Sequence, residues 1–271
     1  MTINELDLDF EGMNVHCWEG GSGFPVVMIH GSGPGASTMG NWRNVLDPMA
    51  ERYRIIACDM IGFGLSGRKA QEPYFDLDMW TRQGQFVLDH HAPEGEVGIV
   101  AHSLAAVFAI RLALKHNRIT KLLITGSTGQ RFPLDEVGMA VWTFPESREE
   151  LRRAMEFIIF NKEWITDDFL DNRMQVIGDP EYKDYFTKMF SGDKQRYMDA
   201  THFSDEDLGK LNCDVTFVHG RDDLATKLRD TALPMSQKMK KADLYAIARC
   251  GHGPALEHPD KFMMAANNLF G

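Results

Sequence analysis

A serine lies where a short apolar segment passes into a segment typical of a helix. Ser103 follows the apolar residues 97–100 and stands at the centre of the sequence AHSLA at 101–105. A serine on a tight strand-to-helix turn exposes its Oγ at the carboxyl end of a sheet, beside the positive end of the helix dipole, and small residues two positions away on each side avoid collisions. The pattern predicts a nucleophile. Because alanines stand where such turns usually carry glycines, a small-residue turn without chemistry stays an alternative.

A glycine-rich loop offers backbone N–H groups to a negative charge. The apolar residues 26–29 lead into HGSGPGAS at 30–37, and the free N–H groups of such a loop can stabilise an oxyanion. A phosphate-binding loop is the alternative, but the Lys-Ser/Thr pair of a P-loop is absent and the GxGxxG spacing of a dinucleotide site is not met. We therefore favour anion stabilisation without phosphate.

An acid and a histidine follow two further apolar segments. Asp223 ends the sequence GRDD after residues 215–219, and His252 lies in the sequence RCGHGP after residues 244–248. Each alone could be an ordinary turn or loop residue. With Ser103 they give the chain order Ser, Asp, His, each at the carboxyl end of a predicted strand, which is the order of one triad-bearing fold. The coincidence predicts a triad in which the histidine is the base.

The elements that would position these residues alternate along the chain. Short, continuous apolar runs are typical of strands covered on both faces of a parallel sheet, and helical segments separate them. After a starting hairpin, the alternation predicts a doubly wound α/β sandwich with right-handed crossovers. The predicted strands are 6–10, 14–19, 26–29, 54–58, 97–101, 121–125, 215–219 and 244–248, and the predicted helices between them are 42–52, 77–90, 105–116, 228–239 and 259–270.

The alternation stops after residue 128. Two amphipathic helices are predicted at 146–160 and 166–177, with no strand between them. Since strands of the same style resume afterwards, we expect this segment to cap one edge of the same sheet. The predicted domains are an α/β core formed by 1–128 and 209–271 and a helical cap, or lid, at 129–208.

Composition excludes several classes of protein. The chain has 271 residues, 25% of them charged and 44% hydrophobic, as expected of one large folded domain rather than a disordered chain. Its net charge of −10 disfavours nucleic acid as a partner, because phosphates attract basic proteins. The most apolar window, 97–114, is interrupted by polar residues, whereas ~20 apolar residues are needed to span a bilayer. No membrane partner is therefore predicted.

The N-terminus and the cysteines favour a cytoplasmic protein. The acidic sequence MTINE at 1–5 predicts neither a secretory signal nor a transit peptide. The cysteines form no CxxC or Cys/His cluster, so we predict reduced, buried thiols and no metal site. They are Cys17, Cys58, Cys213 and Cys250.

Nearly the whole chain resembles the α/β-hydrolase fold, whose characteristic turn after its fourth strand is matched by DMIGFGLS at 59–66. Within that superfamily it most resembles the hydrolases of meta-cleavage products, which cut a carbon–carbon bond in the dienoates left by aromatic ring opening. The features that carry this resemblance are HGSGPGA followed by NWRN at 41–44, the GRDD sequence, and WITDD at 164–168 leading to Arg173.

The resemblance implies roles for the three residues of the predicted triad. Ser103 would be the nucleophile or a water-activating hydroxyl, and His252 would be the acid/base. Asp223 would orient the histidine in preference to its neighbour Asp222, because the family's acid usually lies three residues after the glycine.

The resemblance also implies an oxyanion hole and a carboxylate site. The backbone N–H groups of Ser32 and Leu104 would bind the oxyanion, and Asn41 and Arg173 would hold the substrate's carboxylate and 2-enol oxygen. A dianionic dienoate needs a fixed cation that favours ketonisation, and a planar guanidinium can bind a carboxylate through two hydrogen bonds. Two alternatives stay open: Asn41 as the N-cap of a helix beginning at Trp42, and Arg173 as a solvated residue of the cap surface.

The chain departs from the family pattern at four positions. His102 stands in place of an asparagine, Ala105 and Ala106 in place of glycines, and Gly253 in place of a tryptophan after the histidine. We interpret His102 as a packed neighbour of the serine rather than a second base. Loss of the tryptophan would change the pocket and admit a different or bulkier group on the leaving side.

These features together predict a cofactor-independent, serine-type hydrolase with a small-molecule substrate. Its predicted reaction is cleavage of a carbon–carbon bond in a 2-hydroxy-6-oxohexa-2,4-dienoate-like ring-fission product. A carboxylesterase or lactonase is the second hypothesis, a non-catalytic ligand receptor of the same fold the third, and a cofactor-free dioxygenase the fourth. Whether the chain forms a homo-oligomer stays open.

Overall fold

An eight-stranded sheet forms the centre of the computed structural model, which describes residues 2–271. The strands are β1 (Asn4–Phe10), β2 (Met13–Gly20), β3 (Pro25–Ile29), β4 (Arg54–Cys58), β5 (Val97–His102), β6 (Ile119–Thr125), β7 (Asp214–Gly220) and β8 (Ala242–Ile247). They lie in the order β1-β2-β4-β3-β5-β6-β7-β8. The pairs β1/β2 and β2/β4 are antiparallel, and the six strands from β4 to β8 are parallel. The predicted mostly parallel, doubly wound sheet is confirmed.

Burial on both faces explains why the central segments form strands. All six residues of β5 are buried, as are four of the five residues in β3 and in β4. A strand covered on both faces has apolar side chains in succession rather than in alternation. β1, at the edge of the sheet, has mostly exposed or half-buried residues.

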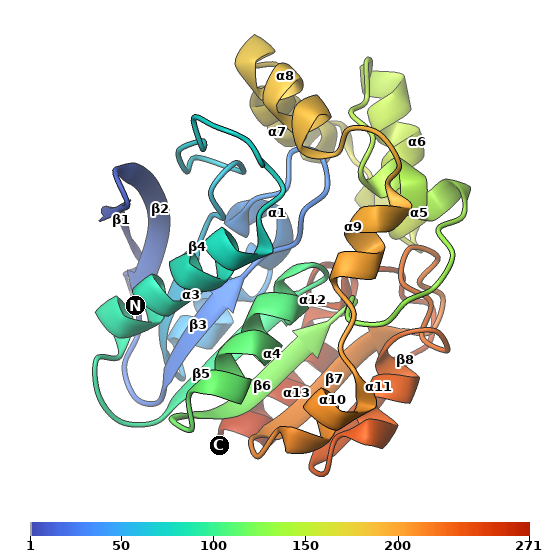
Figure 1. The fold of residues 1–271 in the computed structure, drawn as a ribbon. Helices are drawn as coiled ribbons and strands as arrows, with labels where there is room; N and C mark the ends of the chain where they lie inside the picture. The colour runs from blue at the N-terminus through green and yellow to red at the C-terminus, as the bar shows by residue number, and fades with distance from the viewer. Residues whose placement is uncertain (1) are drawn as a thin grey trace.

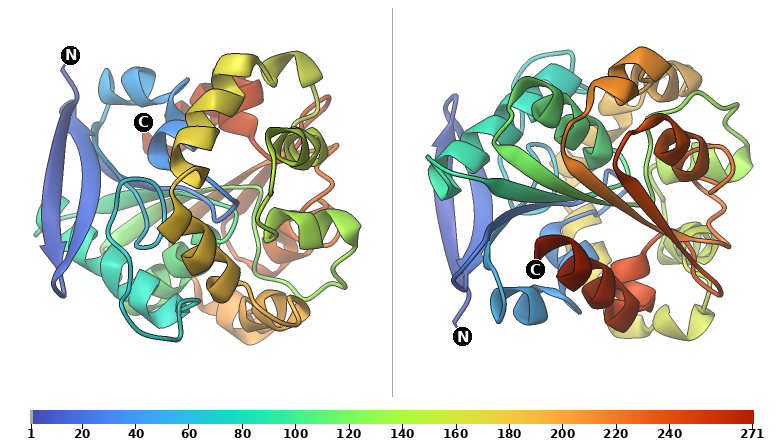
Figure 2. Two further views of the ribbon diagram at one scale, coloured as in Figure 1. Left: turned by 90° about the horizontal axis from the view of Figure 1, so that it is seen from above. Right: turned by 90° about the horizontal axis from the view of Figure 1, so that it is seen from below.

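Helices cover the two faces of the sheet (Figure 2). On one face α3 (Leu77–His91) and α4 (Ala105–Lys115) pack against each other and against the strands, and α11 (Ala232–Lys238) adds buried residues to the same cluster. On the other face lie α1 (Thr38–Trp42), α2 (Leu46–Ala50), α12 (Pro254–Glu257) and α13 (Pro259–Phe270). The buried side chains of the two faces form separate apolar clusters, so the sheet is held between two cores.

The single helix predicted at 42–52 is wrong. The structure has α1 and α2 instead, and the chain leaves the helical conformation at Val45, whose φ is −126°. Pro48 is the third residue of α2, where a missing N–H group is tolerated; within one long helix it would have removed a backbone hydrogen bond and collided with the preceding turn. The proline therefore favours a new, short helix.

The segment between β6 and β7 is built of helices, and α6, α7 and α8 lie beyond the carboxyl ends of the strands (Figure 1). The segment contains α5 (Glu136–Val141), α6 (Arg148–Ile158), the 3-10 helix η1 (Lys162–Trp164), α7 (Asp167–Ile177), α8 (Pro180–Met189), α9 (Gln195–Ala200) and α10 (Asp205–Lys210). The two predicted helices correspond to α6 and α7, whereas η1, α5, α8, α9 and α10 were not predicted. Asp179 caps α8 and Pro180 is its first residue, a helix start that the sequence contains. We keep the term cap for residues 129–208; the predicted boundary at 208 falls within α10.

The cysteines and the apolar character of the helices were compared with the predictions. All four cysteines are buried free thiols, as predicted. Among residues 2–271, no helix combines the length and the apolar character that crossing a bilayer requires.

Candidate active site

Ser103 lies in the turn between β5 and α4 with a backbone φ of 56°. This left-handed conformation is strained for a serine. Hydrogen bonds stabilise the turn: the N–H of Ser103 donates to the carbonyl of Thr125 at 2.9 Å, and its carbonyl accepts from the N–H of Ala106 at 3.1 Å. The loop after β3 comes so close that a Cβ added at Gly31 would lie 3.0 Å from the Cβ of Ser103. The turn therefore holds the serine hydroxyl in one direction.

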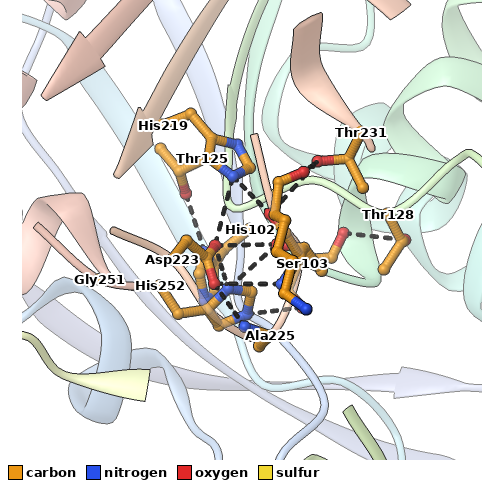
Figure 3. Close-up of polar contacts among 12 residues, drawn as sticks. His102, Ser103, Thr125, Thr128, His219, Asp223, Ala225, Thr231, Gly251 and His252 are labelled. Atoms are coloured by element: carbon orange, nitrogen blue, oxygen red, sulfur yellow. Dashed lines mark hydrogen bonds and ion pairs between the residues drawn. The ribbon is translucent and has the colours of Figure 1, made fainter. Parts of the chain in front are cut away.

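The three side chains of the predicted triad lie in one hydrogen-bonded row (Figure 3). Nε2 of His252 is 3.0 Å from Oγ of Ser103, and Nδ1 of the same ring is 2.8 Å from Oδ2 of Asp223. The residues follow β5, β7 and β8, and all three are buried. An imidazole in this position can take the proton of the serine while the carboxylate fixes its orientation.

The carboxylate of Asp223 is charged despite its burial. Burial raises its pKa, but the attraction of His252 and the hydrogen bonds from the two neighbouring histidines outweigh that effect and hold the pKa well below the usual range. Its Oδ1 accepts the backbone N–H groups of Ala225 and Thr226 at 2.9 and 3.1 Å, and its Oδ2 accepts the Thr226 hydroxyl at 2.9 Å. Nε2 of His219 lies 3.3 Å from Oδ2. Charge-stabilising donors thus surround the acid.

The neighbouring acid, Asp222, takes a different partner. Its Oδ2 accepts the backbone N–H of Arg249 at 2.8 Å, which closes the loop after β8. The cap in turn holds the histidine loop, because the N–H of His252 donates to the carbonyl of Ile158 at 2.7 Å. The geometry therefore brings Asp223, and not Asp222, to the imidazole.

The two residues predicted to supply oxyanion-binding N–H groups, Ser32 and Leu104, lie on different elements beside the serine. Ser32 lies in the loop after β3. Leu104 is the N-cap residue of α4, and the N–H groups at the start of a helix have no intrahelical partner. Neither N–H donates a hydrogen bond to another residue within 2–271. Both residues are almost completely buried and border the serine turn. Both N–H groups are therefore without a protein partner among residues 2–271, and their role in an oxyanion hole stays a prediction.

Arg173 is buried, contrary to the alternative of a solvated residue. It lies on α7 with 9% of its surface exposed, its Nη1–H donates to the carbonyl of Pro34 at 2.9 Å, and its guanidinium lies 5.3 Å from the centre of the Phe169 ring. Burial lowers its pKa to about 10, so the side chain carries a charge at neutral pH. The charged and polar neighbours that affect its pKa are Tyr182 and Arg43 rather than a carboxylate, and among residues 2–271 its Nε has no hydrogen-bond partner. A buried cation without a counter-ion is a strong site for an anion.

Asn41 is not a helix N-cap. α1 begins at Thr38 and is capped by Ser37, whose Oγ accepts the N–H of Gly40 at 3.0 Å. Asn41 therefore lies within the helix, and its side chain lines the same hollow as Ser103 and Arg173. Its amide can donate and accept hydrogen bonds there.

His102 packs beside His252, with ring centroids 4.6 Å apart, and its Nδ1 is 2.9 Å from the hydroxyl of Thr125. Burial and the adjacent His252 hold the pKa of His102 well below its usual range, which keeps the ring neutral. Its position agrees with our interpretation as a packed neighbour, although the ring also forms part of the wall of the hollow.

The hollow that reaches Ser103 has a volume of about 60 Å³. Asn41 and Arg173 are among its polar lining residues, together with the serine and the two histidines, and apolar cap residues such as Met155 and Ile158 also line it. Gly253 lies in its wall, where a Cβ would meet Leu256 at 3.6 Å. Within residues 2–271 no group of three or more His, Cys, Asp or Glu side chains is arranged to hold a metal ion.

The sequence analysis missed three side chains that support the site. Thr226 and His219 contact the Asp223 carboxylate, and the Trp142 indole N–H donates to Oγ of Ser32 at 2.9 Å. The spacing of Thr226 three residues after the acid is typical of a local side-chain-to-backbone turn and could have been noticed. His219 also lies close to the acid in the chain, four residues before it, whereas the contact between Trp142 and Ser32 joins residues 110 positions apart and leaves no local pattern.

A serine on a strand-to-helix turn, with an acid and a histidine after later strands, is the arrangement typical of α/β hydrolases. The α/β hydrolase family model matches residues 26–265, and the chain belongs to this family. The predicted family is confirmed.

Several relatives are similar over most of their length. The chain is 33% identical over 252 residues to the 2-hydroxymuconate semialdehyde hydrolase of Pseudomonas sp. strain CF600, with 93% of this chain and 88% of that protein covered. It is 29% identical to the 2-hydroxy-6-oxo-2,4-heptadienoate hydrolase of Pseudomonas putida, with 95% and 93% covered. Its fold matches the meta-cleavage product hydrolase CumD from Pseudomonas fluorescens IP01, a mutant complexed with acetates, with a TM-score of 0.91, 30% identity, and 97% and 96% of the two chains covered.

Proposed function

We propose that this hydrolase cleaves a carbon–carbon bond in a 2-hydroxy-6-oxohexa-2,4-dienoate-like product of aromatic ring fission. The observation that carries the proposal is the buried, unpaired cation of Arg173 in the same hollow as the Ser103–His252 pair. A simple ester needs no such cation, whereas a dienoate carries a carboxylate. The names of the three relatives, all acting on substrates of this kind, support it.

In the proposed reaction, the polar residues of the hollow first shift the enol–keto equilibrium of the substrate toward the keto form. Arg173 binds the carboxylate and the 2-oxygen, and Asn41 provides a further hydrogen bond. The 2-hydroxyl loses its proton and C5 gains one, so C5 becomes a carbon that can leave with an electron pair stabilised by the 2-oxo group. The fixed positive charge favours this shift because negative charge collects at the carboxylate end.

Addition at C6 and fragmentation would follow at the predicted triad. Ser103, or a water that it activates, adds to the C6 carbonyl while His252 takes the proton. The resulting oxyanion is held by the N–H groups of Ser32 and Leu104. The C5–C6 bond then breaks, and His252 returns the proton to the leaving fragment. With one water consumed, the products are a carboxylic acid and a 2-hydroxydienoate.

Removing the cation tests the proposal. We expect Arg173→Ala to lower kcat/KM for a ring-fission dienoate by about 100-fold or more, the size of effect that follows loss of a buried charge partner, while turnover of a small p-nitrophenyl ester stays close to that of the wild type. Loss of the dienoate's visible absorbance measures the first reaction. Arg43→Ala is the matched control, since Arg43 also lies over the Phe169 ring but does not line this hollow.

Unchanged dienoate turnover by the Arg173→Ala variant would refute the carbon–carbon assignment. The second candidate is then a carboxylesterase or lactonase, for which the hydrogen-bonded Ser103, His252 and Asp223 suffice. In every case the Ser103→Ala variant is expected to lose turnover of dienoate and ester alike.

We also propose that the protein works in the cytoplasm on a small-molecule substrate. The four free thiols favour a reducing compartment, because oxidising compartments promote disulfides.

A further inference from the structure

A second hollow, with a volume of about 320 Å³, lies against the cap helix α7. Its walls are formed mainly by α7, by α1 and by the loops after β3 and β4. It shares Gly40, Phe169 and Arg173 with the hollow that reaches Ser103, but neither Ser103 nor His252 is among its lining residues. Pockets for small organic ligands begin at about 300 Å³. The second hollow is thus large enough for a ligand and distinct from the site of the predicted triad.

Two arginines line the second hollow and lie against one aromatic ring. The guanidinium carbons of Arg43 and Arg173 are 5.1 and 5.3 Å from the centre of the Phe169 ring. Burial lowers the pKa of Arg43, and no carboxylate of residues 2–271 offsets that shift. After burial, the charge of Arg43 is a further cause of the lowered pKa of Arg173, so the two cations repel each other. An anion bound beside both guanidinium groups would compensate for this repulsion.

The acidic residue in the wall, Asp59, already binds two backbone donors. Its Oδ1 accepts the N–H of Thr38 at 2.6 Å, and its Oδ2 accepts the N–H of Leu65 at 2.7 Å. Two amide side chains of α7, Asn172 and Gln175, are exposed in the same wall and can donate hydrogen bonds. The hollow therefore offers hydrogen-bond donors and cations to a ligand, while its carboxylate is engaged by the backbone.

Apolar side chains form much of the remaining wall. They are Trp18, Met39, Leu65 and Val176. Leu65 and Met39 have 62% and 43% of their surface exposed, which leaves large apolar side chains in contact with water. Exposed apolar side chains that gather beside a hollow are typical of a binding site. A ligand with an apolar body would cover them.

We propose that the second hollow binds a small carboxylate with an apolar body, such as an aromatic acid. Its carboxylate pairs with Arg43 and Arg173, and its body lies against the apolar side chains of the wall. A planar guanidinium can hold a carboxylate through two hydrogen bonds, and an aromatic body fits a wall that contains an indole and a phenyl ring. The site goes beyond the proposed function, because it needs no reaction at Ser103. Its failure in the test would leave the proposed carbon–carbon cleavage standing.

Benzoate is the probe, and isothermal titration calorimetry measures its binding. We expect Arg43→Ala to weaken benzoate binding at least about 10-fold, because a charge-assisted pair is lost. Asn41→Ala is the control, since Asn41 lines the hollow at Ser103 and not the second hollow, and its affinity for benzoate should stay close to that of the wild type. Weakening by Asn41→Ala without weakening by Arg43→Ala would place benzoate beside Ser103 and overturn the proposal. Absence of binding to the wild type at about 10 mM benzoate would overturn it as well.

A neutral probe of the same shape separates charge from apolar fit. We expect benzamide to bind the wild type at least about 10-fold more weakly than benzoate, because the two guanidinium groups favour a carboxylate over an amide. Equal affinities for the two probes would overturn the assignment of an anion site.

An added acid in the wall keeps the test open if Arg43→Ala fails to fold. We expect Asn172→Asp to weaken benzoate binding several-fold, because its negative charge repels the carboxylate, and the exposed position tolerates the change. Asn161→Asp is the matched control, since it adds the same charge at an exposed cap residue that does not line the second hollow. Equal weakening in these two variants, or none in either, would overturn the proposal.

Discussion

Asp223 keeps its negative charge although it is almost completely buried. Charge attraction and four neighbouring donors compensate for the lost hydration, as its lowered pKa reflects. Asp222 is adjacent in the chain but binds a backbone N–H outside the row. Of these two adjacent acids, therefore, Asp223 contacts the imidazole and Asp222 does not.

This pair of acids gives a matched prediction. We expect Asp223→Asn to lower kcat by about 10⁴-fold, because an amide stabilises the wrong imidazole tautomer and no imidazolium. Asp222→Asn should leave kcat within a few-fold of the wild type, since the acid holds only the loop at Arg249. Steady-state kinetics on one substrate measures both variants. The reverse order of effects would assign the orienting role to Asp222.

At the scale of elements, the cap holds the loop that carries the Ser32 N–H group. Three cap side chains contact successive parts of this loop: Trp142 bonds to Oγ of Ser32, Arg173 to the carbonyl of Pro34 and the Tyr182 hydroxyl to the N–H of Gly35. All three contacts are buried. The position of this loop thus depends on the docking of the cap.

Tyr182→Phe tests this dependence by removing one hydroxyl. The N–H of Gly35 would lose its partner in a buried site, so we expect a loss of about 1–3 kcal/mol in unfolding free energy and a lower kcat with little change in KM. Tyr185→Phe is the control, because its hydroxyl accepts the N–H of Lys69, outside the loop that carries Ser32, at a longer distance of 3.3 Å. Denaturant unfolding and steady-state kinetics measure the two effects. An equal fall in kcat in both variants would contradict a specific role of the loop contact.

At the scale of the whole molecule, the net charge of −10 opposes an anionic substrate. A buried cation such as that of Arg173 attracts an anion only at short range, within the hollow. The field of the surface charges acts over a longer range and is weakened by salt.

The approach of a dianionic dienoate should therefore depend on ionic strength. We expect kcat/KM for the dienoate to rise between about 0.01 and about 0.15 M salt, as the Debye length falls from about 30 to about 8 Å, while kcat/KM for a neutral ester stays constant. Paired assays in the same buffers measure the difference. A fall with salt for the dienoate would mean that local positive charge at the entrance outweighs the net charge.

Local sequence determined the strands and the reactive turn. The continuous apolar runs of β3 to β7 predicted a sheet covered on both faces. The preference of such a run for a fully buried strand depends only on its own residues. The small residues around Ser103 predicted the tight turn for the same reason. Helix boundaries were less predictable, as Pro48 shows for α2, since a local breaker can outweigh a helical pattern.

Only the tertiary structure decided the contacts between distant segments. Ser103 and His252 are 149 residues apart in the chain, and their distance of 3.0 Å follows from the order of strands in the sheet. The burial of Arg173 and the choice of Asp223 over Asp222 likewise depend on how the cap and loops pack. Periodicity in sequence reports the preference of one segment for a buried face, whereas these properties are distances between segments, which packing alone sets.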